Sequence, residues 1–172
     1  MTVGNGRLVE WAAKAGFSFG SADKGGVLFY NRGGEDRYYV RPYAGEFLRI
    51  TSASRREDEA YVLDARSEVA AEAYFWMKFG PGVRYSLNLE RLRLPITKEE
   101  VAHPYVLDDG ETTRLQLLGP NGEAALVVDA AWDPASDVAQ LVKCSWALAH
   151  PISEVEESFL AVDGRPLFHV AR

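Results

Sequence analysis

Residues 17–40 read FSFGSADKGGVLFYNRGGEDRYYV, and this stretch decides how the first half of the chain folds. Three runs rich in aromatic and β-branched residues alternate with two glycine-rich segments, SADKGG and RGGED. Such runs favour strands, and the glycine pairs favour the tight turns that join antiparallel neighbours. We therefore expect a meander with Lys24 at the tip of its first hairpin.

Strand and helix signals continue on both sides of this meander. Residues 7–15 carry apolar side chains at helical spacing before Gly16, so they predict a short N-terminal helix. On the C-terminal side, one further strand-like run precedes a solvated, charged loop and a possible last strand. The strands expected in this half are residues 17–19, 27–31, 37–41, 47–52 and 60–63.

The middle of the chain predicts a longer helix. Ser67 is a suitable N-cap for SEVAAEAYFWMKFG, whose apolar residues share one helical face. The Gly80-Pro81-Gly82 sequence indicates that the helix ends at Gly80. We expect an irregular extended segment over residues 83–94.

The second half repeats the hairpin pattern and then becomes helical. A capping box from Thr97 to Glu100 predicts a short helix over residues 98–102, and Asp133-Pro134 predicts the start of a helix that reaches Leu148. Residues 138–148 are also compatible with a strand. The remaining expected elements are strands 104–107, 114–118 and 124–129, a short helix capped at Ser153 that reaches Leu160, and a strand over 167–170.

Together these elements predict an α+β fold. Its largely antiparallel sheets form two hairpin-rich halves, with N-terminal, central and C-terminal helices packed on them. A length of 172 residues with 47% hydrophobic residues is suited to one domain, residues 1–172. Cys144 is the only cysteine, so no intrachain disulfide can form, and its apolar neighbours predict a buried thiol.

Charge and composition narrow the possible partners. The net charge is −6, with 25 acidic against 19 basic residues, and this balance repels phosphate backbones, so we expect no nucleic-acid partner. No run approaches the roughly 20 apolar residues of a membrane span, and the N-terminal stretch is too polar for a signal peptide. We therefore expect a cytoplasmic protein without a membrane partner.

The sequence contains no recognisable catalytic or cofactor motif. In residues 20–26 the lysine precedes the glycines, no hydroxyl residue follows them, and a strand follows where a phosphate-binding loop needs a helix. His103, His150 and His169 are widely spaced, so we expect no metal site. The sequence also lacks the GxSxG and HExxH motifs. We expect a protein that is not an enzyme and holds no cofactor.

Residues 17–40 are instead typical of a binding surface. Tyrosine and arginine anchors beside adaptable glycine loops are enriched at protein interfaces. The simpler alternative is that the glycines only supply the positive φ of tight turns. The side chains considered for this surface are Phe17, Phe19, Phe29, Tyr30, Tyr38, Tyr39 and Tyr43 beside Lys24, Arg32, Arg37 and Arg41.

Three segments resemble the immunity protein 61 family. They are WAAKAGFSFGSADKGGVLFYNRGGEDRYYV (residues 11–40), EAYFWMKFG (72–80) and VDGRPLF (162–168). The resemblance implies a cytoplasmic protein that binds, one to one, the catalytic domain of a cognate secreted toxin. It further implies that this toxin is an NAD glycohydrolase and that the immunity protein blocks its NAD site.

The resemblance also implies where the contact is made. In the family a lysine-glycine pair on a flexible loop enters the toxin active site, and the matching residues are Lys24 and Gly25, with Asp23 and Gly26 supporting the turn. Two alternatives remain at this point. One is a secretion chaperone or another partner-binding protein, and the other is a small enzyme or ligand-binding domain with a pocket formed by scattered residues.

Overall fold

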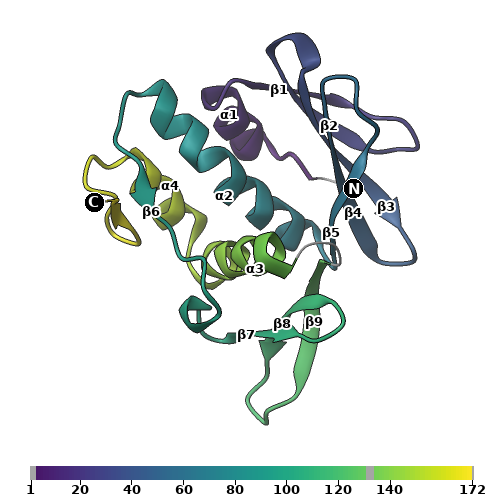
Figure 1. The fold of residues 1–172 in the computed structure, drawn as a ribbon, viewed down its shortest axis with the longest axis vertical. Helices are drawn as coiled ribbons and strands as arrows, with labels where there is room; N and C mark the ends of the chain where they lie inside the picture. Colours follow the sequence, from purple (N-terminus) through teal and green to yellow (C-terminus); the bar gives the residue numbers. More distant parts are fainter. Residues whose placement is uncertain (1–2, 131–133, 172) are drawn as a thin grey trace.

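The computed structural model describes residues 3–130 and 134–171 (Figure 1). Four helices and ten strands make up its regular structure, together with two 3₁₀ turns, η1 (Arg32–Gly34) and η2 (Lys98–Glu100). The helices are α1 (Gly6–Lys14), α2 (Glu68–Ser86), α3 (Pro134–Ala149) and α4 (Ile152–Leu160). The strands are β1 (Phe17–Ser21), β2 (Val27–Asn31), β3 (Asp36–Tyr43), β4 (Phe47–Ser54), β5 (Ala60–Ala65), β6 (Leu92–Arg93), β7 (Tyr105–Asp109), β8 (Thr113–Leu118), β9 (Ala124–Ala130) and β10 (His169–Val170).

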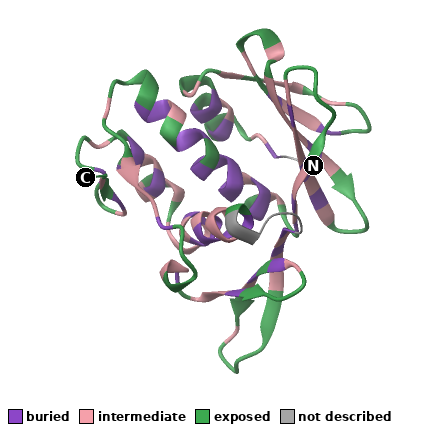
Figure 2. Ribbon diagram, viewed as in Figure 1, coloured by how far each residue is buried: buried purple, intermediate pink, exposed green. Residues whose placement is uncertain are grey.

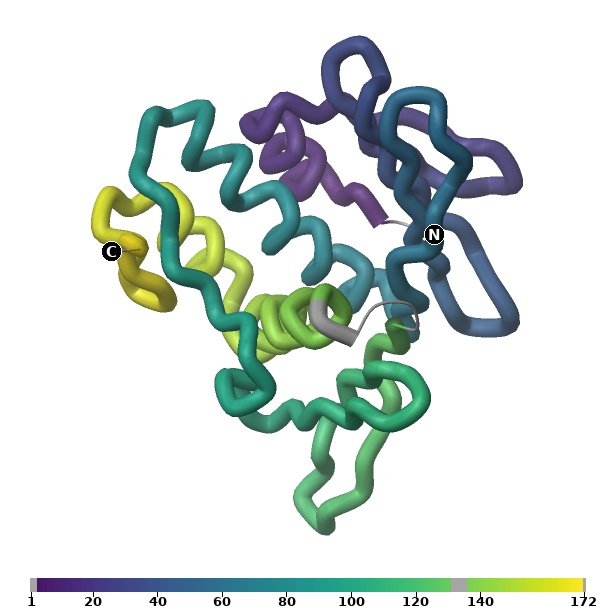
Figure 3. Tube along the Cα trace, in the orientation of Figure 1, coloured from purple at the N-terminus to yellow at the C-terminus, as the bar shows by residue number. Residues whose placement is uncertain are grey.

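Eight strands form one antiparallel sheet in the order β1-β2-β3-β4-β5-β9-β8-β7. The meanders β1–β5 and β7–β9 meet where β5 pairs with β9, through Asp64 opposite Asp129 and Ala65 opposite Val128. Figure 3 shows the β7–β9 meander extending away from β1–β5. The prediction of an α+β fold with two hairpin-rich antiparallel halves is confirmed.

The core lies between the β1–β5 meander and α2. Figure 2 shows that much of α2 is buried, and Phe75 and Phe79 are the centre of its contact with the sheet. The Phe29 ring lies 4.7 Å from Phe75 and 5.3 Å from Phe79, and the Phe17 ring lies 4.8 Å from Phe79, centroid to centroid. Burial of each such ring stabilises the fold by about 1.5–3 kcal/mol. One face of the meander is thereby covered by helices.

The predicted end of the central helix is wrong. Helix α2 continues through Gly80 and Pro81 to Ser86, so residues 83–86 are helical and only Leu92–Arg93 of the predicted extended segment forms a strand. Gly80 is a packing residue, because a Cβ atom there would lie 2.3 Å from the ring of Phe159 on α4. Close contact with a second helix, not chain reversal, explains this glycine.

A buried arginine fastens the part of α2 beyond the proline. Arg84 is 2% exposed, and its guanidinium donates hydrogen bonds to the carbonyl oxygens of Glu90, Phe159, Ala161 and Val162. Four acceptors satisfy most of the five donors of a buried guanidinium. The last turn of α2 is thereby connected to the loop that follows it and to the end of α4.

The C-terminal half differs from prediction at its helix starts. The capping box of Thr97 and Glu100 is confirmed, but the turn that it caps is a 3₁₀ helix over Lys98–Glu100. Residues 138–148 are helical, so the strand alternative is wrong, while the predicted cap Asp133 lies outside the described residues. The capping box at Ser153 is wrong, because α4 begins two residues earlier than that cap implies, at Ile152 with Pro151 at its N-cap.

Candidate interaction surface

The four residues singled out by the sequence lie together in the loop between β1 and β2. The loop closes through a hydrogen bond from the Ala22 amide to the Gly26 carbonyl (2.9 Å) and one from the Gly26 amide to the Asp23 carbonyl (3.1 Å). Lys24 (φ 53°) and Gly25 (φ 74°) both adopt the left-handed conformation. The predicted hairpin tip is therefore present, and its lysine is exposed.

Two glycines of this loop have different structural roles. A Cβ atom at Gly25 would have open space around it, so the positive φ of this residue, and not close packing, favours glycine there. Gly26 is buried, and a Cβ atom there would lie 2.6 Å from the carbonyl oxygen of Val40 and 2.7 Å from Cγ of Arg41. Gly26 thus lets the loop rest directly on β3, while Gly25 leaves the tip unobstructed.

An arginine on β3 holds the base of the loop. Arg41 contacts the Asp23 carboxylate through Nε (2.7 Å) and Nη2 (2.6 Å), and it also forms a bidentate ion pair with Glu59 (2.6 and 3.0 Å). The Thr51 hydroxyl donates a hydrogen bond to the same glutamate (2.5 Å). Charge-assisted, bidentate pairs of this kind fix geometry well. Asp23 therefore anchors the loop to β3 through Arg41. The sequence did not reveal Glu59 as the second partner of Arg41.

The electrostatics of this cluster leave the tip lysine available. The Arg41 hydrogen bond is the main cause that lowers the pKa of Asp23, and Arg41 likewise lowers the pKa of Glu59. Both carboxylates are thus ionised at neutral pH and occupied by Arg41. Lys24 forms no ion pair with any residue that the structure describes. The tip therefore presents an exposed ammonium group, whose charge also helps to lower the pKa of the neighbouring Asp23.

The strand face beside this loop is rich in tyrosine and arginine. Arg49 forms a bidentate pair with Asp64 (2.8 and 2.7 Å) and lies 3.3 Å from the centre of the Tyr43 ring. Arg41 lies 4.4 Å from the Tyr39 ring. Tyr43 is 42% exposed. We call the residues Tyr30, Tyr39, Arg41, Tyr43 and Arg49 the outer strand face.

Strand alternation corrects the set of aromatic anchors expected from the sequence. Tyr30, Tyr39 and Tyr43 belong to the outer strand face, whereas four other rings point inward, because successive side chains of a strand alternate between the two faces of the sheet. Those four pack on each other or on the rings of α2, so they stabilise the fold and are not contact residues for a partner. They are Phe17, Phe19, Phe29 and Tyr38.

The residues considered for chemistry do not assemble into a reactive centre. Cys144 is buried, as predicted, and burial raises the pKa of its thiol to about 12. Among residues 3–130 and 134–171, no three histidine, cysteine or acidic side chains gather as they would around a metal ion. No helix in the described parts of the chain is long and apolar enough to cross a membrane. The loop and the outer strand face together present exposed Lys24, Tyr30 and Tyr43.

Comparison with known proteins gives consistent results over nearly the full chain. The proteins described as "Immunity factor for TNT" from Mycobacterium tuberculosis and "Immunity factor for TNT homolog" from Mycobacterium bovis are each 30% identical over 179 residues, covering 98% of this chain and 96% of theirs. The solved structure described as "Rv3902c from M. tuberculosis" superposes with a TM-score of 0.82 at 27% identity, covering 96% of this chain and 94% of that one.

The family assignment follows from the extent of the match. The model of the family described as "Immunity protein 61" matches residues 11–167. This range includes the β1–β2 loop, the outer strand face, the end of α1 and the whole of α2, α3 and α4. A match of this length covers both meanders and the contact between β1–β5 and α2. The chain therefore belongs to the immunity protein 61 family.

Proposed function

We propose that this protein is the antitoxin of a cognate NAD-glycohydrolase toxin and blocks its NAD site by inserting the β1–β2 loop. The observation that carries the proposal is the likeness, over 98% of this chain, to a protein described as an immunity factor for TNT. An inhibitor that acts by occlusion needs shape and charge, and no reactive group of its own. The partner is the catalytic domain of the toxin, bound one to one in the cytoplasm.

The geometry of the loop supports this role. A lysine on a left-handed turn extends beyond the strands, and the adjacent Gly25 has no side chain to prevent close approach of the backbone. The exposed ammonium of Lys24 suits a recess lined by carboxylates. Because Arg41 and Gly26 hold the base of the loop on β3, little ordering is needed on binding, and preorganisation of this kind favours affinity.

One loop is too small to supply the whole interface. Stable complexes bury about 1,600 Å² of surface in total, several times what five residues can cover. The outer strand face adjoins the loop through Arg41 and offers exposed tyrosines beside half-buried arginines, two residue types that dominate binding energy at many interfaces. We propose that this face forms the rim around the inserted loop.

The proposed function is tested by co-purification and an activity assay. The protein is expressed with the toxin encoded beside it, the complex is isolated, and its stoichiometry is measured by light scattering. NAD hydrolysis by the isolated toxin is then followed with and without the protein. We expect a one-to-one complex and a loss of NAD hydrolysis at equimolar ratio. A stable complex in which hydrolysis continues would support a chaperone instead, and failure to bind would refute the proposal.

A further inference from the structure

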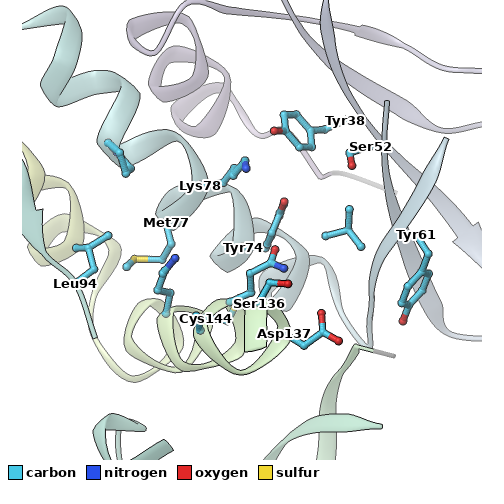
Figure 4. Close-up of a pocket in the computed structure, with 15 residues that line it drawn as sticks. Tyr38, Ser52, Tyr61, Tyr74, Met77, Lys78, Leu94, Ser136, Asp137 and Cys144 are labelled. Atoms are coloured by element: carbon cyan, nitrogen blue, oxygen red, sulfur yellow. The ribbon is translucent and has the colours of Figure 1, made fainter. Parts of the chain in front are cut away.

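A cleft of about 640 Å³ lies on the opposite side of the β1–β5 meander, between the sheet, α2 and α3 (Figure 4). Its volume is within the range of sites that bind small molecules. Tyr38 and Ser52 line it from the sheet, Met77 and Lys78 from α2, and Lys143 from α3. This cleft has no part in the proposed contact with a toxin, because the β1–β2 loop contributes none of its lining.

Two lysines from different helices line this cleft. Lys143 is half-buried, and burial together with the nearby charge of Lys78 lowers its pKa. Neither ammonium forms an ion pair with a residue in the described parts of the chain. Two neighbouring cations repel each other, and partial burial adds a desolvation cost. A bound anion would relieve both costs.

A buried tyrosine adds a neutral donor to the same cleft. Tyr74 is 4% exposed, and burial raises its pKa, so its hydroxyl remains protonated. Tyr74 lines the cleft, and its neutral hydroxyl can donate one hydrogen bond. In Figure 4 it points toward the side of the cleft where Ser52 and Lys78 lie. The Tyr74 hydroxyl is therefore a candidate hydrogen-bond donor to a ligand bound on this side of the cleft.

The remaining lining favours a ligand with an apolar body. Met77, Pro81 and Leu94 supply apolar contacts, and the Tyr38 ring lies 5.2 Å from the Lys78 ammonium. The carboxyl group of Asp137 also lines the cleft, six residues before Lys143 on α3, which is about 9 Å at 1.5 Å per residue. Its charge opposes an anion at that end, so the anionic group is directed toward the lysines.

We propose that this cleft binds a small organic oxyanion, a carboxylate or phosphate carried on an aromatic or apolar body. Lys78 and Lys143 bind the oxyanion, Tyr74 donates a hydrogen bond to it, and Met77 and Leu94 contact the body. The site does not depend on the proposed antitoxin function. It makes this protein a small-molecule binder in addition to its membership of an immunity family.

The test is an NMR titration of the isotopically labelled full-length protein with four probes: phenyl phosphate, benzoate, inorganic phosphate and phenol. We expect saturable shifts of α2 and α3 amides around the cleft with phenyl phosphate or benzoate. The preferred one identifies the oxyanion. Inorganic phosphate lacks the body and phenol lacks the charge, so both bind more weakly. Lys78→Met and Lys143→Met should each weaken binding about tenfold, the size of one charge-assisted hydrogen bond.

The titration has a matched control variant, Lys98→Met, and defined results that would contradict the proposal. Lys98→Met removes a lysine outside the cleft, where it pairs with Asp109 at 2.5 Å, and should leave probe affinity unchanged. If Lys143→Met fails to fold, the exposed Lys78 still tests the site, because its replacement leaves the core intact. Absence of saturable shifts at the cleft with both organic anions overturns the proposal. So does affinity that Lys78→Met leaves unchanged, or shifts confined to another part of the surface.

Discussion

At the scale of single residues, individual side-chain contacts hold short segments of the chain in one conformation. Arg41 connects the loop residue Asp23 to Glu59 on the far side of β4. Glu100 does the same for the turn that follows β6, since its carboxylate accepts hydrogen bonds from the amides of Ile96 (2.9 Å) and Thr97 (3.0 Å). Each contact can be removed by one substitution without opening the core.

We predict that Arg41→Met loosens the β1–β2 loop while the fold persists. Exposed ion pairs contribute only about 0–1 kcal/mol each, so the midpoint of denaturant unfolding should change little. Hydrogen exchange at the amides of Ala22 and Gly26 should become faster, because Asp23 loses its partner. Arg66→Met, which removes a longer 3.6 Å pair with Glu46, is the control. Equal exchange rates in both variants would contradict this role of Arg41.

A second prediction concerns pH. Hydrogen bonds from the Ile96 and Thr97 amides lower the pKa of Glu100 from 4.5 to about 2. Because its pKa is lower in the folded state, the stabilisation is fully present above about pH 4.5 and is lost as pH falls toward about 2. Glu100→Gln should reduce the fall in unfolding free energy between these pH values, measured by urea titration. A variant with the same pH profile as the unchanged protein would show that Glu100 is not the group responsible.

At the scale of elements, helix α2 connects the β1–β5 meander to the other helices, and α3 contacts the β7–β9 meander. Helix α2 packs on β1–β5 through its phenylalanines, contacts α3, and meets α4 where Gly80 lies against Phe159. Its length beyond Pro81 positions Arg84 to bind the end of α4. The packing of α2 against α4 therefore requires a residue without a side chain at position 80.

We predict that Gly80→Ala destabilises the protein by about 1–3 kcal/mol through overpacking, since the new Cβ atom would lie 2.3 Å from the Phe159 ring. Without this contact, alanine inside the helix would instead stabilise α2 by about 0.5–1 kcal/mol relative to glycine. Gly6→Ala, at the start of α1 with nothing within 4 Å, is the matched control and should be close to neutral. Denaturant unfolding of both variants gives the comparison. A Gly80→Ala protein as stable as the Gly6→Ala protein would contradict the packing explanation.

The same elements show what the sequence could predict. Hairpins, the Thr97 capping box and the Lys24 tip depend on residues close together in the chain, and all are where the pattern placed them. The packing role of Gly80 could not be predicted, because Phe159, which lies against it in the fold, is distant in sequence. The link from Asp23 through Arg41 to Glu59 likewise depends on the register of several strands. Local signals predicted the loop, and tertiary packing determined what supports it.

At the scale of the whole molecule, the sheet separates two surfaces. Helices and the lysine-lined cleft lie on one side of β1–β5, and the outer strand face with its adjoining loop lies on the other. A protein partner at the loop and a small oxyanion in the cleft could therefore be bound together. This arrangement makes the two proposals independently testable, because variants of one surface leave the other intact.

The central claim is that Lys24 and Gly25 enter the toxin, and titration calorimetry of the toxin with loop variants tests it most directly. The double variant Lys24→Glu, Gly25→Trp should bind at least about thirtyfold more weakly, or about 2 kcal/mol, because it reverses the charge and adds bulk at the tip. Gly122→Trp is the matched control, since Gly122 also has a positive φ and open space. It should bind as the unchanged protein does. Unchanged toxin affinity in a folded double variant would contradict insertion of the loop.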